Sequence, residues 1–216
     1  MASISLWIGD NCMASTVTTL LDAFSIANLW NRALSEIESD NKTEKESPDL
    51  FECRVVTTDG RPATGHGSLT LTPNQAISEV TDTDCVVISP GLPHLYPVPR
   101  DIDRLRCWLE RLREKGTTIA TVCTGAFLLA EMGLLDGKKA TTNWQFARLF
   151  QKLHPEVNLV PEDMLTEDDN IICAGAATAV YHLGIHLIKK YGSRQLAASC
   201  SKALLVDPNR LSQAPY

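Results

Sequence analysis

The strongest constraint on the fold is an alternation along the chain between short apolar runs rich in β-branched residues and longer segments with apolar residues at helical spacing. The runs predict buried strands at residues 4–8, 51–57, 85–89, 117–122 and 171–174, with short extra strands at 69–72 and 140–142. The longer segments predict helices at residues 16–34, 102–115, 125–132, 144–153, 177–191 and 193–205. Such alternation is typical of an α/β fold, in which a doubly wound, mostly parallel sheet carries helices on both faces.

Length, charge and hydropathy limit the class of protein. The 216 residues are enough for one sizeable core, and no change of composition marks a second domain. The formal net charge of −6 argues against a domain that itself grips a phosphate backbone, because such a domain needs a basic face. The start of the chain lacks the features of a signal peptide, and no stretch approaches the roughly 20 apolar residues that span a bilayer. We therefore expect a cytoplasmic protein without a membrane partner.

Cysteine and histidine spacing gives no disulfide or metal pattern. The seven cysteines are an odd number and show no CxxC spacing. His182 and His186 lie four residues apart on a predicted helix and could bind a metal together, but no third ligand occurs at a recognisable spacing. We expect these histidines at the helix surface or at a dimer contact, and we assign no metal and no cofactor.

The segment at residues 117–137 places one cysteine at a sharp turn. Cys123 follows a run of Thr, Ile and Val residues, and Gly125 and Ala126 allow a tight turn into the next helix. A sulfur in this position lies at the carboxyl end of a parallel sheet, where doubly wound folds bind ligands. Because a helix N-terminus favours a thiolate, we expect Cys123 to be the most reactive cysteine, with a pKa moderately below that of a free thiol. The alternative is a buried cysteine that only packs.

A second element is predicted beside Cys123. The strand at 85–89 runs into Pro90, Gly91 and Leu92, a turn whose backbone N–H groups could receive an anion or a carbonyl oxygen. An ordinary strand-ending turn explains these residues equally well. Asp10 and Cys12, in the loop after the first strand, are expected to face the same pocket, although a polar loop without a role there is the simpler interpretation.

Several motifs together resemble a known family. The run CTGAFLLA begins at Cys123, GLLDG begins at Gly133, and ATTNW covers residues 140–144. With the first-helix pair at 27–28, SPG at 89–91 and AGA at 174–176, these motifs closely resemble the ThiJ/PfpI superfamily, which has the class I glutamine amidotransferase-like, flavodoxin-like fold. The nearest resemblance is to the N-terminal domain of AraC-type transcription regulators, and it covers nearly the whole chain.

The resemblance also shows where this sequence departs from the family's enzymes. Those enzymes surround the cysteine with a carboxylate from the first helix and often with a histidine. The carboxylate position falls on Thr16, the histidine of the frequent TTHW motif falls on Asn143, and Thr124 replaces the histidine that follows the cysteine in peptidase-like members. Because none of these side chains is a base at neutral pH, we do not expect efficient turnover at Cys123. Asn143 is instead well placed to cap the helix that begins at residue 144.

The end of the chain suggests how such a domain is used. Residues 206–216 resemble the segment that joins the sensory domain of AraC-type regulators to two helix-turn-helix motifs; a frayed natural tail is the alternative. We therefore divide the chain into an α/β domain at 1–205 and the start of a linker at 206–216. The resemblance implies a homodimer that contacts DNA only through a domain absent from this sequence.

The function expected from these observations is that of a non-catalytic regulatory domain that binds an unknown small-molecule effector. The expected ligand-binding residues are Thr16, Gly91, Leu92, Cys123, Thr124 and Asn143. One alternative is an isonitrile hydratase-like, glyoxalase-like or peptidase-like enzyme with Cys123 as nucleophile. Another is a redox sensor that acts through oxidation of Cys123. A carboxylate at position 16 would have favoured the enzyme.

Overall fold

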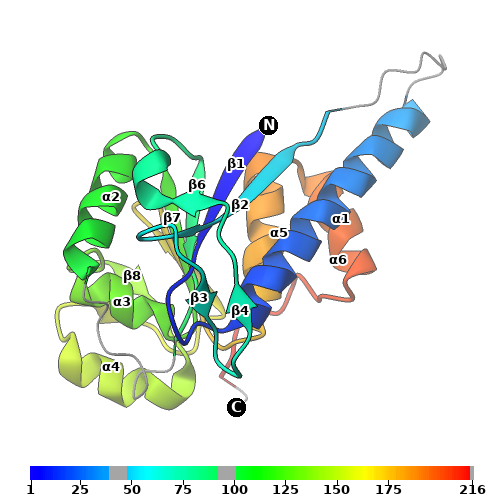
Figure 1. The fold of residues 1–216 in the computed structure, drawn as a ribbon. Helices are drawn as coiled ribbons and strands as arrows, with labels where there is room; N and C mark the ends of the chain where they lie inside the picture. Colours follow the sequence, from blue (N-terminus) through cyan, green and yellow to red (C-terminus); the bar gives the residue numbers. More distant parts are fainter. Residues whose placement is uncertain (39–47, 92–100, 215–216) are drawn as a thin grey trace.

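A seven-stranded sheet forms the centre of the molecule (Figure 1). The computed structural model describes residues 1–38, 48–91 and 101–214. The strands of the sheet are β1 (Ala2–Trp7), β2 (Phe51–Thr57), β5 (Gln75–Ala76), β6 (Cys85–Ile88), β7 (Thr118–Val122), β10 (Leu165–Asp168) and β11 (Ile171–Ala174). Their order is β10-β11-β7-β6-β1-β2-β5, and every neighbouring pair is parallel except β10 with β11.

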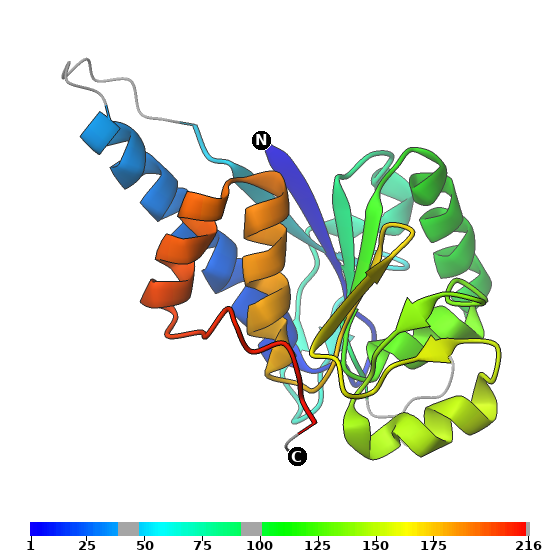
Figure 2. The same cartoon turned by 180° about the vertical axis from the view of Figure 1, so that it is seen from behind.

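Helices cover both faces of this sheet. The α-helices are α1 (Ala14–Glu38), α2 (Ile102–Glu114), α3 (Gly125–Glu131), α4 (Ala147–Leu153), α5 (Ala179–Tyr191) and α6 (Arg194–Ala203). Figures 1 and 2 show α1, α5 and α6 on one side of the sheet and α2, α3 and α4 on the other. The predicted doubly wound, mostly parallel α/β fold is therefore confirmed.

Smaller elements complete the structure. They are the 3₁₀ helices η1 (Ile77–Glu79) and η2 (Trp144–Phe146) and two small sheets, β3 (Ala63–Thr64) with β4 (Thr70–Leu71) and β8 (Lys139–Ala140) with β9 (Asn158–Leu159). Within the described part of the chain, no helix combines the length and apolar character needed to cross a membrane.

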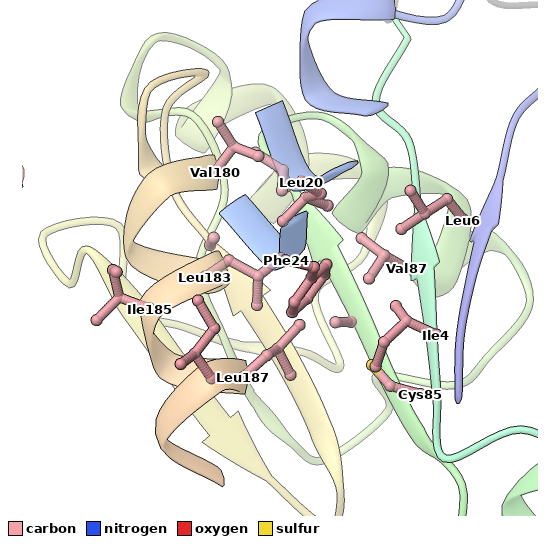
Figure 3. Close-up of a cluster of buried hydrophobic side chains, with 14 of the residues drawn as sticks. Ile4, Leu6, Leu20, Phe24, Cys85, Val87, Val180, Leu183, Ile185 and Leu187 are labelled. Carbon is pink, nitrogen blue, oxygen red and sulfur yellow. The ribbon is translucent and has the colours of Figure 1, made fainter. Parts of the chain in front are cut away.

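The central strands are apolar on both sides because both sides are covered. In β1, Ile4 and Leu6 belong to the core beneath α1 and α5, whereas Trp7 belongs to the core on the opposite face. Figure 3 shows Ile4 and Leu6 directed toward Leu20 and Phe24 of α1. Each buried methylene stabilises the fold by about 0.8 kcal/mol, so these runs strongly favour the sheet interior.

The predicted elements agree with the structure in the centre of the fold and differ at its edges. Strands β2 and β11 have the predicted bounds, and the short strands expected at 69–72 and 140–142 correspond to β4 and β8. The antiparallel edge strand β10 was not predicted, because its sequence Leu-Thr-Glu-Asp is short and largely polar. Helix α1 continues beyond the end predicted at residue 34, to Glu38; residues 39–47 lie outside the described residues.

Candidate functional site

Cys123 occupies a strained turn between β7 and α3. Its φ of 57° lies in the left-handed region, which costs an ordinary residue about 1–2 kcal/mol. Two hydrogen bonds hold this conformation: the Cys123 N–H donates to Ala174 O over 2.8 Å, and the Thr142 hydroxyl donates to Cys123 O over 2.8 Å. The turn predicted from the sequence is thus fixed by strand β11 and by the segment after β8.

The residue that begins α3 must be a glycine. A Cβ atom at Gly125 would overlap the hydroxyl oxygen of Thr121, which donates a hydrogen bond to Ile88 O over 3.2 Å. The close approach of α3 to β6 and β7 therefore depends on Gly125 having no side chain.

The turn after β6 lies against the cysteine turn. The Thr124 hydroxyl donates to Gly91 O, and Gly91 forms an antiparallel bridge with Cys12. The N–H of Met13 donates to Pro90 O over 2.9 Å. The structure thus brings together three predicted site residues, Cys123, Thr124 and Gly91, and places the predicted Cys12 beside them. Leu92 lies outside the described residues, so its predicted role stays a prediction.

Asn143 makes two contacts that fix the orientation of its amide. Its Oδ1 accepts a hydrogen bond from the Gln145 N–H over 2.9 Å, which confirms the predicted helix cap. Its Nδ2 then faces Cys123 and donates to Sγ over 3.5 Å. Because a backbone N–H can bond only to the oxygen, the amide nitrogen is the group that meets the sulfur.

The sulfur of Cys123 is enclosed rather than activated. The residue is only 4% exposed, and this burial raises the pKa of its thiol above the ordinary value. Hydrogen bonds from Asn143 and Thr124 lower the pKa, but they do not offset the burial. The moderately lowered pKa that we expected is therefore wrong in direction. Among the described residues, no charged group contributes to this change in the pKa of Cys123.

The first-helix position and the β1 loop supply no base for the sulfur. Thr16 is buried in the first turn of α1, and no hydrogen bond among the described residues joins it to Cys123. The carboxylate of Asp10 accepts from the Thr64 N–H over 2.9 Å. Asp10 thus anchors β3 in place of serving Cys123, while the role predicted for Thr16 stays a prediction.

The two helical histidines contact neighbouring parts of the same chain. His182 Nε2 lies 3.2 Å from Asp207 O, and His186 Nε2 lies 2.8 Å from Glu167 Oε2 on β10. The part of the chain that the structure describes holds no group of three or more metal-ligating side chains. These histidines therefore tie α5 to its neighbours.

The C-terminal segment, residues 206–214, returns to the main body of the domain. Figure 2 shows it passing from α6 across the start of α5. Gln213 is 2% exposed; its Nε2 donates to Thr142 O over 2.9 Å and to Pro161 O over 2.7 Å, and its Oε1 accepts from the Ala176 N–H over 3.0 Å. Sequence reasoning missed this residue, because no local pattern indicates a contact across some 70 residues.

Comparison with known proteins agrees with this geometry. The family model described as DJ-1/PfpI matches residues 43–190. The chain belongs to the DJ-1/PfpI family. The predicted resemblance to ThiJ/PfpI proteins is thereby confirmed. The cysteine turn lies within the residues that the family model matches.

Relatives of this DJ-1/PfpI domain include regulators and an enzyme. The chain is 27% identical over 194 residues to the HTH-type transcriptional regulator CdhR of Pseudomonas aeruginosa, covering 90% of this chain and 55% of that protein. It is 30% identical over 135 residues to an isonitrile hydratase of Pseudomonas putida, covering 61% of this chain and 55% of that protein. The chain thus spans about half the length of the curated relatives it matches.

A solved structure shares the fold. An AraC family transcriptional regulator from Pseudomonas putida superimposes with a TM-score of 0.74 at 17% identity, covering 94% of this chain and 100% of that chain. At this level of identity the likeness concerns the fold of the DJ-1/PfpI domain alone.

Proposed function

We propose that this chain is the ligand-sensing regulatory domain of an AraC-type transcription regulator and that it does not catalyse a reaction. The observation that carries the proposal is the environment of Cys123. The turn is complete, yet the groups beside its sulfur are all neutral: the side-chain amide of Asn143, which donates a hydrogen bond, and the backbone N–H and hydroxyl of Thr124. A cysteine nucleophile needs an adjacent base or a lowered pKa. This turn offers neither and suits binding of a small molecule better than turnover.

The route for the signal is the C-terminal segment. Gln213 donates a hydrogen bond to Thr142, whose hydroxyl donates to the carbonyl oxygen of Cys123. Gln213 also accepts from the N–H of Ala176, which lies two residues after Ala174, the residue whose carbonyl oxygen accepts from the Cys123 N–H. A ligand that shifts the cysteine turn changes the geometry that Gln213 requires. A DNA-binding domain attached beyond residue 216 then receives the change through this segment.

The chain is also proposed to act as a cytoplasmic homodimer that reaches DNA only through the attached domain. The net charge of −6 supports the second point, because a phosphate backbone repels an acidic domain. Leu29 and Trp30 on α1 are 61% and 40% exposed, and a second copy would cover them. Light scattering on the purified chain measures the mass directly.

The enzyme remains the competing candidate because of the similarity to isonitrile hydratase. Oxidation at Cys123 is disfavoured, since thiolate character and exposure govern that reaction and this thiol has a raised pKa and is buried.

Turnover assays separate sensing from catalysis. We would measure the hydration of cyclohexyl isocyanide, the conversion of methylglyoxal and the hydrolysis of labelled casein by the purified chain and by Cys123→Ser. The expected rates are at background for both proteins. Robust turnover that disappears in Cys123→Ser would show that the protein is an enzyme with Cys123 as its nucleophile.

A further inference from the structure

A cavity of about 430 Å³ lies between α5, β10 and the C-terminal segment. Its volume is in the range of small-molecule sites. Leu165, Ile185 and Leu211 give it an apolar wall from each of these three elements. Figure 3 shows Ile185 on the side of α5 away from Phe24. None of the described lining residues belongs to the predicted site around Cys123.

Of the three Asp, Lys and Arg side chains in the described lining of this cavity, two are positively charged. Lys189 and Arg210 line it from α5 and from the C-terminal segment. Lys189 has no ion-pair partner in the described ranges. The one lining carboxylate, Asp163, is neutralised by Lys139 Nζ at 2.7 Å. The described lining thus holds two cations, and its carboxylate already has a positively charged partner.

His182 links the cavity to the C-terminal segment without adding charge. Burial lowers the pKa of its imidazole, and the nearby positive charge of Arg210 adds to this effect. The neutral ring donates from Nε2 to Asp207 O over 3.2 Å. This contact holds the segment that carries Arg210 and Leu211 against α5, so a ligand in the cavity touches the helix and the segment together.

We propose that the cavity binds a small organic carboxylate. Its apolar body packs on Leu165, Ile185 and Leu211, and its carboxylate lies between Lys189 and Arg210. Charge-assisted hydrogen bonds to both cations select a carboxylate over an alcohol or an amine of the same length. This site is separate from the ligand site proposed at Cys123, and its existence does not depend on the regulatory function.

The probe for this site is hexanoate, titrated into the isotopically labelled 216-residue chain and followed by amide chemical shifts. Hexan-1-ol and hexylammonium are the matched probes without the negative charge. We expect saturable shifts with hexanoate at residues around Lys189 and Arg210, and at least roughly tenfold weaker binding of the other two probes. Equal binding of the three probes, no saturable binding of hexanoate, or shifts centred on Cys123 and Asn143 would overturn the proposal.

Three surface variants test the residues. Lys189→Gln and Arg210→Gln should each weaken hexanoate binding roughly tenfold, because each removes one charge-assisted contact. Lys202→Gln, an exposed position on α6 outside the cavity, is the matched control and should bind hexanoate like the parent chain. Since all three positions are at the surface, the variants should keep the amide spectrum of the folded parent. An equal loss in Lys202→Gln, or no loss in the other two, would contradict the assignment.

Discussion

The side-chain amide of Gln213 donates a hydrogen bond to the carbonyl oxygen of Thr142 over 2.9 Å. The hydroxyl of Thr142 donates in turn to the carbonyl oxygen of Cys123 over 2.8 Å. The C-terminal segment and the cysteine turn therefore belong to one hydrogen-bond network, although Gln213 lies 90 positions after Cys123 in the sequence.

The first prediction concerns the stability that this network provides. Gln213→Ala removes the donors to Thr142 and Pro161 and leaves the Ala176 N–H without its acceptor. Because a buried group left unpaired costs about 1–3 kcal/mol, we expect the free energy of unfolding to fall by about 2–3 kcal/mol in urea titrations. Asn209→Ala, at an exposed position of the same segment, should change it by less than about 0.5 kcal/mol. Equal stability of the two variants would contradict the network.

Cysteine labelling tests the enclosure of Cys123. Of the seven cysteines, all within the described residues, Cys107 alone is exposed. We expect iodoacetamide to modify Cys107 first, and Cys107→Ser to remove the fast phase. The labelling rate of Cys123 should rise with pH around a midpoint above that of an unstructured cysteine peptide, because burial raises its pKa. Faster labelling of Cys123 than of Cys107 at pH 7 would show an open, activated sulfur instead.

Two substitutions separate the roles of Asn143. Asn143→Asp keeps an acceptor for the Gln145 N–H, so stability should change by less than about 0.5 kcal/mol, but its carboxylate raises the pKa of Cys123 further and slows labelling at pH 8. Asn143→Ala removes the cap, so the free energy of unfolding should fall by about 1 kcal/mol. It also removes the donor to the sulfur, so labelling of Cys123 should be slower. Faster labelling in Asn143→Asp would show that Asn143 does not donate to the sulfur.

Buried cysteines should make the protein sensitive to alkaline pH. Burial raises the pKa of Cys200 to about 11 and that of Cys173 to about 12. In an unfolded chain the pKa of a cysteine thiol is about 8.5. The folded state then holds protons that the unfolded state has lost, so stability is full below about pH 8.5 and falls as pH rises. Each such cysteine contributes up to about 1.4 kcal/mol per pH unit.

Urea midpoints measured between about pH 8 and 10 test this dependence. Cys200→Ala should flatten the slope, whereas the exposed control Cys107→Ala should leave it unchanged. A stability that stays constant over this range, or a slope that Cys200→Ala does not alter, would show that these thiols titrate in the folded protein.

The parts of the structure that could be predicted are those determined by interactions between residues close together in the sequence. Strand β7 and the turn at Cys123 follow from a β-branched run that ends before Thr124 and Gly125. The cap at Asn143 follows from its place before η2. These features depend on residues close together in the sequence, so pattern and capping preferences indicate them.

The parts that could not be predicted depend on tertiary contacts. The raised pKa of Cys123 reflects burial by distant segments, which outweighs the nearby helix N-terminus. Strand β10 forms because β11 offers an edge to pair with, and its own residues show no strand pattern. The burial of Gln213 depends on carbonyl groups some 50 to 70 residues away.

Hydrogen–deuterium exchange on a chain modified at Cys123 tests the proposed coupling most directly. In a Cys53→Ser and Cys107→Ser background, which removes the half-buried and the exposed cysteine, methyl methanethiosulfonate at alkaline pH attaches a methylthio group to Cys123, and peptide mapping by mass spectrometry confirms that the adduct lies on this residue. Because the added group displaces a packed turn, we predict faster exchange of the amides of Gln213 and Ala176, which are hydrogen-bonded in the parent structure. Unchanged exchange at both amides in the fully modified protein would contradict a signal that passes from the cysteine turn to the C-terminal segment.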